Sequence, residues 1–279
     1  MMAIDLTVTF AFQLDEAADA LLQFEAAPLA DQRIVSSSTS LPDGALISRV
    51  AAQDGVGERI WINAQGRVEV RYEALVEFGR ALDTMDSLRG ATLPDLPDYV
   101  VPYLMGSQYC PAAQFADFAG ECFLPIEGAG ARVLAIRDWV ADNIAYTPGA
   151  SGPETSATDT FHAGAGVCRD FAHLFVTLAR ASAIPARYAA CYAPGVAPQD
   201  FHAVAQVFLA DENGNAGWRI IDATGMADPG QTAIIGVGRD AGDVSFLTSF
   251  GPMQFLESKV EVAVHSQPSE PQASKAAVV

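Results

Sequence analysis

Basic side chains are scarce in this sequence of 279 residues. It has 16 Lys and Arg against 34 Asp and Glu, which gives a formal net charge of −18. Binding to a polyanion requires clustered Lys and Arg, because these side chains neutralise phosphates. We therefore expect no nucleic acid partner, and we interpret the acidity as an aid to solubility.

Long apolar runs and a secretion signal are also missing. The apolar run 204–210 has only the length of a strand, whereas a membrane-spanning helix needs about 18 to 20 apolar residues. Residues 1–14 contain no Lys or Arg, although a secretion signal begins with a positive flank. We expect a soluble, cytoplasmic protein that does not enter a membrane.

Cysteines are few, and the common cofactor motifs are absent. The four cysteines form no CxxC pair; they are Cys110, Cys122, Cys168 and Cys191. This spacing does not indicate a disulfide scaffold or a zinc knuckle. HExxH, an EF-hand loop, a phosphate loop and GxSxG are missing too. We expect reduced thiols, no metal and no cofactor.

The first part of the chain has the pattern of β-strands. Apolar residues alternate with polar or small ones over 4–14, which is typical of a strand with one buried face. Further strand-like runs lie at 45–50, 59–63 and 67–72. The last two are expected to form a hairpin across 64–66. Residues 1–92 are therefore predicted to be a small all-β domain.

A proline-rich segment separates this domain from the rest of the chain. The sequence LPDLPDYVVP begins at residue 93, and proline fits neither a helix interior nor a sheet ladder. We predict a linker at 93–110, a second domain at 111–264 and a flexible tail at 265–279. The tail has few large apolar groups and two prolines.

The second domain is predicted to mix helices with strands. A helix is expected at 131–144, and an irregular loop rich in Gly, Ser, Thr and Pro at 147–166. Apolar residues after Cys168 recur at helical spacing and stop before Pro185, which predicts a helix that begins at Cys168. Strands are then expected at 186–193, 203–210 and 218–222.

Cys168 is the best candidate for a nucleophile. A thiol attacks an amide carbonyl as the thiolate, so the site must favour that form and supply a base. A helix N-terminus carries about half a positive charge and free N–H groups, which stabilise a thiolate and later an oxyanion. Gly164 and Gly166 allow the backbone to approach closely before the cysteine.

His202 and Asp222 are candidates for the base and its orienting carboxylate. His202 begins a predicted strand, and Asp222 ends the neighbouring one, so both side chains can project from the sheet edge toward the helix. A carboxylate that holds one imidazole nitrogen fixes the tautomer and the ring plane. By contrast, His173, His265 and Asp170 are interpreted as packing or surface residues, and the other three cysteines as structural thiols.

Three segments resemble the core of bacterial transglutaminase-like proteins: GAGVCRDFAHLFVTLARASAIPARY, DFHAVAQVFL and GWRIIDATG. The resemblance covers residues 100–225, and the preceding β-rich region is similar to one that accompanies this core in many bacterial members. It implies an α+β, papain-like fold in which the helix that carries the cysteine packs on an antiparallel sheet. It also implies a Cys-His-Asp triad, here Cys168, His202 and Asp222.

The resemblance implies a cysteine-dependent enzyme that attacks amides of peptides or proteins, as a peptidase, a deamidase or an acyl transferase. The segment MGSQYCP, residues 105–111, resembles a family feature, and Tyr109 within it is expected to reach the active site. His162 is a second candidate for lining the substrate cleft, although we favour the alternative that it is an exposed loop histidine. The family usually has Trp and Glu shortly after the histidine, and both are absent from Ala203-Val204-Ala205-Gln206. The alternative function is a binding or scaffolding protein on the same fold.

Overall fold

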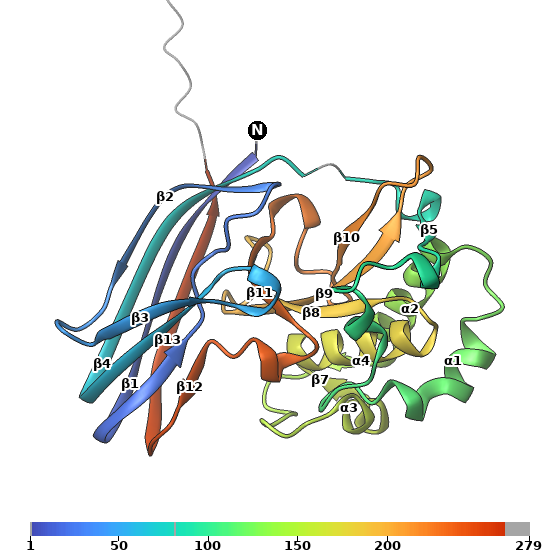
Figure 1. Cartoon of the computed structure of the whole chain (residues 1–279). Helices are drawn as coiled ribbons and strands as arrows, with labels where there is room; N and C mark the ends of the chain where they lie inside the picture. Colours follow the sequence, from blue (N-terminus) through green and yellow to red (C-terminus); the bar gives the residue numbers. More distant parts are fainter. Residues whose placement is uncertain (1, 81, 266–279) are drawn as a thin grey trace, which may run out of the picture.

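The computed structural model describes residues 2–80 and 82–265. Two antiparallel sheets lie side by side, and the helices gather on the second sheet (Figure 1). The helices are α1 (Ala116–Cys122), α2 (Ala129–Asn143), α3 (Ala157–Ala163) and α4 (Cys168–Ala181). The α+β class, with a strand-rich region ahead of the helical part, is confirmed.

The first sheet is long and strongly curved. Its strands are β1 (Met2–Leu22), β2 (Gln32–Ser40), β3 (Leu46–Ala51), β4 (Glu58–Phe78), β12 (Leu247–Ser249) and β13 (Met253–Val264). β1 and β4 pair along almost their whole length. Their alternating apolar residues point to one face and form a single buried core.

The expected hairpin at 64–66 is wrong, because β4 continues through these residues as one strand. Leu14 pairs with Gly66 and Ala18 pairs with Ala64, so three residues of β1 face one of β4. This mismatch is a β-bulge, and the positive φ of Gly66 (+81°) lies beside it. A glycine that resembles a turn residue in the sequence therefore marks a bend within a paired strand.

The C-terminal part of the segment 111–264, which the sequence places in the second domain, returns to the first sheet. β12 and β13 both pair with β1, and β13 does so from Ile4↔Val264 to Leu14↔Met253. Residues 247–264 therefore add strands to the N-terminal sheet instead of the second one. His265 follows directly, with its backbone N–H bonded to the Ala3 carbonyl and its ring to Asp5. The rest of the expected tail, 266–279, lies outside the described residues.

The second sheet supports the helices. Its strands are β5 (Arg89–Gly90), β8 (Ala186–Tyr192), β9 (His202–Ala210), β10 (Ala216–Ile221) and β11 (Ala233–Gly238), in the order β10-β9-β8-β11 with β5 also on β9. Two further short strands, β6 (Ala145–Tyr146) and β7 (Ala165–Gly166), pair in parallel beside α4. A shared apolar core joins α2 and α4 to β8 and β9.

The segment 147–166 is less irregular than expected, because it contains α3 and β7. Ser156 caps α3 by accepting from the Asp159 backbone N–H, and the Asp159 carboxylate accepts from the Ser156 N–H in return. This reciprocal capping stabilises a helix of only seven residues. The Gly, Ser and Pro content of the segment hid the helix from sequence reasoning.

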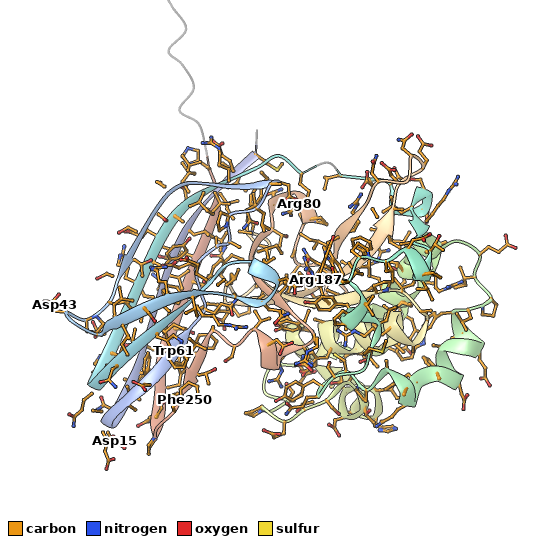
Figure 2. All side chains as sticks on the ribbon, in the orientation of Figure 1. Asp15, Asp43, Trp61, Arg80, Arg187 and Phe250 are labelled. Atoms are coloured by element: carbon orange, nitrogen blue, oxygen red, sulfur yellow. The ribbon has the colours of Figure 1, made fainter. Side chains whose placement is uncertain are left out.

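A cluster around Arg187 joins the two sheets, and Figure 2 shows Arg187 between them. Its guanidinium lies 4.0 Å from the ring centroid of Trp218 and donates to Gln206 Oε1 at 2.8 Å. The guanidinium also donates at 3.3 Å to the carboxylate of Asp54, which lies in the loop between β3 and β4. The same carboxylate accepts from the Tyr103 hydroxyl at 2.6 Å. Tyr103 lies within the expected linker, so that segment is packed into the fold.

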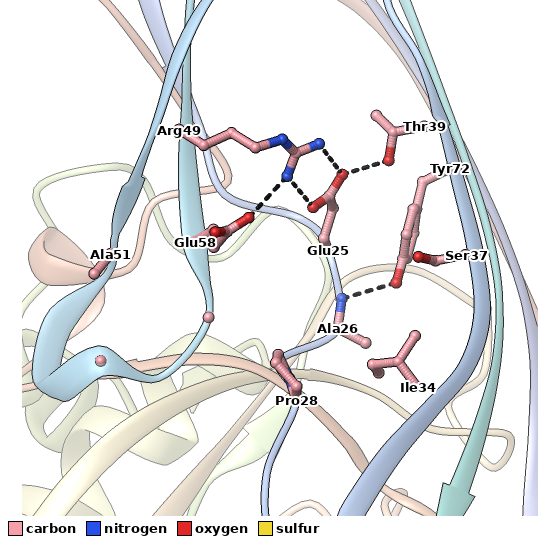
Figure 3. A pocket seen from close by; sticks show the side chains of 12 residues that line it. Glu25, Ala26, Pro28, Ile34, Ser37, Thr39, Arg49, Ala51, Glu58 and Tyr72 are labelled. Atoms are coloured by element: carbon pink, nitrogen blue, oxygen red, sulfur yellow. Dashed lines mark hydrogen bonds and ion pairs between the residues drawn. The ribbon is translucent and has the colours of Figure 1, made fainter.

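A cavity of about 700 Å³ lies on the first sheet, and it contains none of the three candidate catalytic residues. Arg49 crosses it with two bonds to Glu25, at 2.6 and 2.9 Å, and one to Glu58 at 3.0 Å (Figure 3). On the opposite wall, the Tyr72 hydroxyl accepts from the Ala26 N–H at 3.1 Å. These contacts fix the segment after β1 against the sheet.

Within the described ranges, no helix is long and apolar enough to cross a membrane.

Candidate active site

Cys168 is the first residue of α4, as the sequence predicts. The helix begins there because Val167 is extended and its N–H donates at 2.8 Å to the carboxylate of Asp170, three residues on. Gly166 is required next to this contact: a Cβ at Gly166 would lie 2.7 Å from Cβ of Asp170. The thiol is half-buried at the positive end of the helix.

His202 is the first residue of β9, and its side chain is fully buried. It pairs with Cys191 across the ladder between β8 and β9, which fixes the backbone from which the imidazole projects. Its Nε2 lies 3.0 Å from Oδ2 of Asp222. Because an ionised carboxylate only accepts, Nε2 must carry the proton, and Nδ1 is left as the nitrogen that can receive one.

Asp222 follows directly after β10 and is almost completely buried. Besides the imidazole, Oδ2 accepts from the backbone N–H groups of Met226 and Ala227, at 3.0 and 2.7 Å. Oδ1 accepts from the backbone N–H and the hydroxyl of Thr224, both at 2.8 Å. The turn after the strand thus holds the carboxylate in one orientation and satisfies its buried charge.

The charges of His202 and Asp222 stabilise each other. Burial alone lowers the pKa of His202, but the hydrogen bond with Asp222 and the interaction with the Cys168 thiol outweigh it and raise this pKa to about 9. Burial raises the pKa of Asp222, whereas the bonds from His202, Thr224 and Ala227 lower it, and the net direction is downward. The site therefore favours an imidazolium beside a carboxylate.

Nδ1 of His202 is buried and makes no hydrogen bond within residues 2–80 and 82–265. It is the ring nitrogen on the side away from Asp222, and the effect of Cys168 on the pKa of His202 indicates that the thiol is close to the ring. Cys168 and Asp222 are 54 residues apart in sequence. The fold thus brings these two residues and His202 together in one site. An unpaired proton acceptor next to a thiol is the arrangement that can remove its proton.

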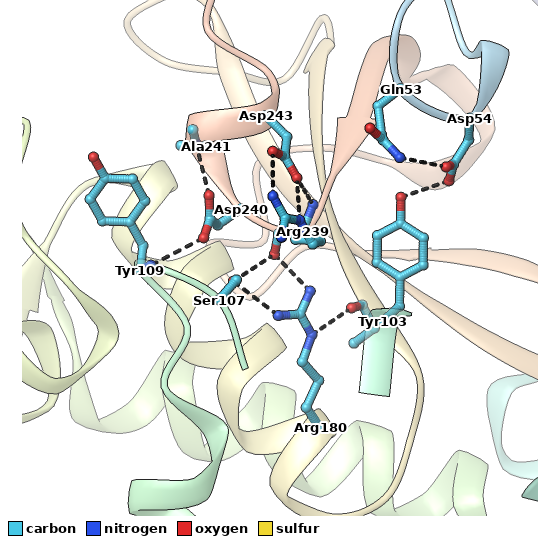
Figure 4. A network of polar contacts seen from close by, with 12 residues as sticks. Gln53, Asp54, Tyr103, Ser107, Tyr109, Arg180, Arg239, Asp240, Ala241 and Asp243 are labelled. Carbon is cyan, nitrogen blue, oxygen red and sulfur yellow. Dashed lines mark hydrogen bonds and ion pairs between the residues drawn. The ribbon is translucent and has the colours of Figure 1, made fainter. Parts of the chain in front are cut away.

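Tyr109 lies near this site without bonding to the three residues. Its ring stacks on His173 with a centroid distance of 5.2 Å, and its backbone N–H donates to Asp240 at 3.1 Å (Figure 4). Ala241 follows Asp240, and its N–H donates to Nε2 of His173. Ala241 and Cys168 pack against the same small apolar cluster. Tyr109 therefore supports the turn at 240–243 that borders the site.

His162 is exposed in the last turn of α3, where its ring centroid lies 5.7 Å from that of Phe161. His173 is a packing residue, as expected: it is fully buried, and burial lowers its pKa to about 3. Cys110 and Cys191 are also fully buried, whereas Cys122 is exposed on α1.

Arg180, in the last turn of α4, fixes the far end of the helix that carries Cys168. It donates to the Ala186 carbonyl at 2.9 Å, the Ser107 hydroxyl at 3.2 Å and the Arg239 carbonyl at 2.6 Å (Figure 4). These partners belong to β8, the segment 105–111 and the turn after β11. One buried guanidinium therefore holds three chain segments around α4.

Sequence reasoning missed Tyr146, which lies in β6 between the predicted helix and the predicted loop. Its ring centroid is 5.9 Å from that of Phe171, which is three residues after Cys168. Burial and the nearby charge of Cys168 raise the pKa of Tyr146. The only sequence signal was an aromatic residue directly before a Thr-Pro-Gly turn, which is too common to indicate a site.

Within the residues that the structure describes, no three His, Cys, Asp or Glu side chains gather in a way that could hold a metal ion. Cys168, His202 and Asp222 offer the chemistry of a thiol, an imidazole and a carboxylate.

Comparisons with known proteins identify relatives of this chain. Residues 117–223 match the transglutaminase-like superfamily. A crystal structure from Cytophaga hutchinsonii, described as that of a candidate cysteine protease, has 30% sequence identity to this chain and a TM-score of 0.87, covering 97% of this chain and 93% of that one. Residues 117–223 therefore form a domain of the transglutaminase-like superfamily. The likeness to the Cytophaga protein includes the N-terminal sheet as well as the helical part, because it extends over nearly the whole chain.

An uncharacterized protein of Mycobacterium leprae is 32% identical over 118 residues. The match spans 40% of this chain and 42% of the relative, so it covers less than half of either protein. Membership of the transglutaminase-like superfamily supports a cysteine-dependent enzyme in general.

Proposed function

We propose that this transglutaminase-like protein attacks amide carbonyls of peptides or proteins through a thioacyl-enzyme formed on Cys168. His202 serves as the general base and then the general acid, and Asp222 orients it. The observation that carries the proposal is the 3.0 Å bond from His202 Nε2 to Asp222, which leaves Nδ1 buried and unpaired next to the thiol at the start of α4.

The residues would act in two half-reactions. The Cys168 proton moves to Nδ1 of His202, which gives the imidazolium that the raised pKa of His202 favours. The thiolate then attacks the carbonyl carbon to form a C–S bond and a tetrahedral intermediate. When the intermediate collapses, the C–N bond breaks and the imidazolium gives its proton to the leaving amine. Asp222 stabilises the imidazolium throughout and remains ionised, in line with the lowered pKa of its carboxyl group.

Water is the acceptor that we favour for the second half-reaction. His202 would remove a proton from water, the hydroxide would attack the thioester, and Cys168 would leave as the free thiol. Transfer to an amine needs a protected second cleft for the acceptor. Water needs no such cleft.

The test is to incubate the protein with a mixture of peptides that contain glutamine and internal amide bonds, and to follow amine and ammonia release together with the mass of the Cys168 peptide. A trapped acyl adduct on Cys168, and the loss of both adduct and product in Cys168→Ala, would support the proposal. Ala is the appropriate replacement because it is small and favourable in a helix.

The competing function is a binding or scaffolding role on the same fold. In that case a correctly folded protein would form no acyl adduct with any peptide or with a reactive ester. That result would reject the enzyme proposal, because a reactive ester acylates an activated thiol irrespective of the natural substrate.

A further inference from the structure

Three phenylalanines form an aromatic strip that begins next to His202: Phe201, Phe246 and Phe255. Phe201 directly precedes His202 in the sequence. The rings of Phe201 and Phe246 are stacked, with centroids 4.6 Å apart and an interplanar angle of 21°. Phe255 meets the Phe246 ring edge to face, at 5.7 Å and 83°. These are the separations of favourable aromatic pairs, so the three rings form one continuous apolar surface.

The aromatic strip is fixed by the buried core of the first sheet. The buried ring of Phe10 lies 6.3 Å from the ring of Phe201 and 5.8 Å from that of Phe246. Phe255 on β13 pairs with Phe12 on β1, so its side chain lies on the same face of the sheet as the core. The strip is therefore the margin of this core, on the face that carries the core residues.

The aromatic strip is only partly covered. Phe201 and Phe246 are half-buried, and Phe255 is 41% exposed. β13 pairs with β1 on one side, and within residues 2–80 and 82–265 no strand pairs with its other side. Single exposed apolar side chains are common on protein surfaces, whereas a contiguous row beside a reactive group indicates a binding surface.

The segment 241–246 connects the aromatic strip with the thiol. Val244 is buried in the small apolar cluster against which Cys168 and Ala241 pack, and Phe246 follows two residues later. Figure 1 shows this part of the chain, between β11 and β12, crossing from the second sheet to the first. Two extended residues span about 7 Å. A substrate residue that is bonded to Cys168 through its carbonyl can therefore lay its side chain on the strip.

We propose that the aromatic strip binds an aromatic or large aliphatic side chain of the substrate, on the residue whose carbonyl Cys168 attacks. This inference rests on the proposed function and deepens it, because it names the substrate class as peptides with an apolar residue at that position. Contact with the rings removes apolar surface of both partners from water. The first sheet, through Phe255, thus contributes to specificity, while the second sheet carries His202.

The experiment compares two esters that acylate the same thiol, the p-nitrophenyl esters of N-acetylphenylalanine and N-acetylalanine. In each reaction the thiolate of Cys168 forms a C–S bond with the carbonyl carbon, the C–O bond breaks, and p-nitrophenolate leaves. Both esters are uncharged and differ only in the phenyl ring. The rate constant of acylation is measured by stopped flow and divided by that of the same ester with 2-mercaptoethanol. The ratio of these normalised rate constants is the side-chain preference.

We expect the original protein to prefer the phenylalanine ester by about 10- to 100-fold, the order of discrimination that apolar contacts provide. Phe255→Ala should reduce this preference by about 2- to 10-fold, the effect of losing one aromatic pair. Phe250→Ala is the matched control and should keep the preference. Phe250 is an exposed phenylalanine at the end of the same sheet, and its ring packs on Trp61 instead of the strip (Figure 2).

Phe255→Leu is a second variant that retains an apolar side chain on the edge strand, and its preference should lie between those of the original protein and Phe255→Ala. Thermal unfolding verifies that each variant is folded. Equal normalised rate constants for the two esters would overturn the role of the strip and leave the thioacyl mechanism intact. A preference that Phe255→Ala does not change, or that Phe250→Ala reduces as strongly, would overturn it too. If neither ester acylates Cys168, the proposed function fails, and the substrate preference fails with it.

Discussion

Replacing Asp222 by Asn separates the charge of this residue from its shape. The two carboxylate oxygens are not equivalent. Oδ2 faces four donors, namely His202 Nε2, the N–H groups of Met226 and Ala227 and the Thr224 hydroxyl. Oδ1 accepts only from the N–H and the hydroxyl of Thr224. The asparagine oxygen should therefore take the Oδ2 position, and its NH₂ group should face Thr224. The tautomer of His202 is then preserved while the negative charge is removed.

Two magnitudes follow from this geometry. The Thr224 N–H loses its acceptor, which costs about 1 to 3 kcal/mol in the free energy of unfolding, since an unsatisfied buried donor carries that penalty. The imidazolium loses its counter-charge, and the acylation rate should fall by about 10² to 10⁴-fold. The upper limit is the loss seen for the equivalent substitution in a serine protease triad, where the tautomer also changes.

The pH dependence of stability gives an independent readout. The pKa of His202 is raised to about 9 in the folded protein, so the stabilisation from its protonated form is complete below the unfolded value of about 6.5. It is lost as the pH rises through about 9. In Asp222→Asn the pKa of His202 should fall, and this loss should occur at lower pH.

NMR titration of the His202 ring, denaturant unfolding from pH 6 to 10 and stopped-flow acylation would be measured on both proteins. Thr224→Val is the matched control, because it removes a hydroxyl from the same turn and leaves the charge in place. If Asp222→Asn acylated at the original rate with an unshifted His202 titration, the role assigned to Asp222 would be refuted.

Two further substitutions test the supports of the site. Gly166→Ala places a Cβ 2.7 Å from Cβ of Asp170, so we expect the free energy of unfolding to fall by about 1 to 3 kcal/mol in thermal unfolding, the range for overpacking. Gly120→Ala is the control and should cost nothing, because Gly120 has open space around it in α1. Equal stability of the two variants would contradict the steric argument. Asp54→Ala leaves the Arg187 guanidinium without its carboxylate between the sheets, and we expect a loss of about 3 kcal/mol in denaturant unfolding with acylation of Cys168 retained. The double variant Asp54→Ala/Arg187→Met should recover part of that loss. An unchanged denaturant midpoint for Asp54→Ala alone would show that the pair does not stabilise the contact between the sheets.

The elements that position the three candidate catalytic residues could be predicted because their signals are local. The apolar spacing after Cys168 defines α4, and His202 and Asp222 stand at the ends of strand-like runs that the structure confirms as β9 and β10. The start of a helix and the ends of two strands can meet at one sheet edge. The candidate site could therefore be predicted from the positions of these residues at the ends of their helix and strands. The distance between His202 and Asp222 depends on strand register, which local sequence does not encode.

The parts that were missed depend on contacts between distant residues. β13 pairs with β1 across about 250 residues of sequence, and nothing within 253–264 indicates which sheet it joins. Gly66 has the character of a turn residue, yet the continuous pairing of β4 with β1 makes it part of a bulge. Tyr146 belongs to a two-residue strand whose partner, Gly166, is 20 positions away, and so it lacked any periodic signal.

The central claim, that Cys168 is activated by His202, is tested most directly by the pH dependence of iodoacetamide labelling, measured at each cysteine by peptide mass spectrometry. Cys122 is the internal reference, because it is exposed on α1, whereas Cys110 and Cys191 are buried. We predict that Cys168 is labelled faster than Cys122 well below pH 8.5, about the pKa of a free thiol, and that His202→Ala abolishes the difference. Labelling of Cys168 no faster than that of Cys122, or unaffected by His202→Ala, would contradict the account.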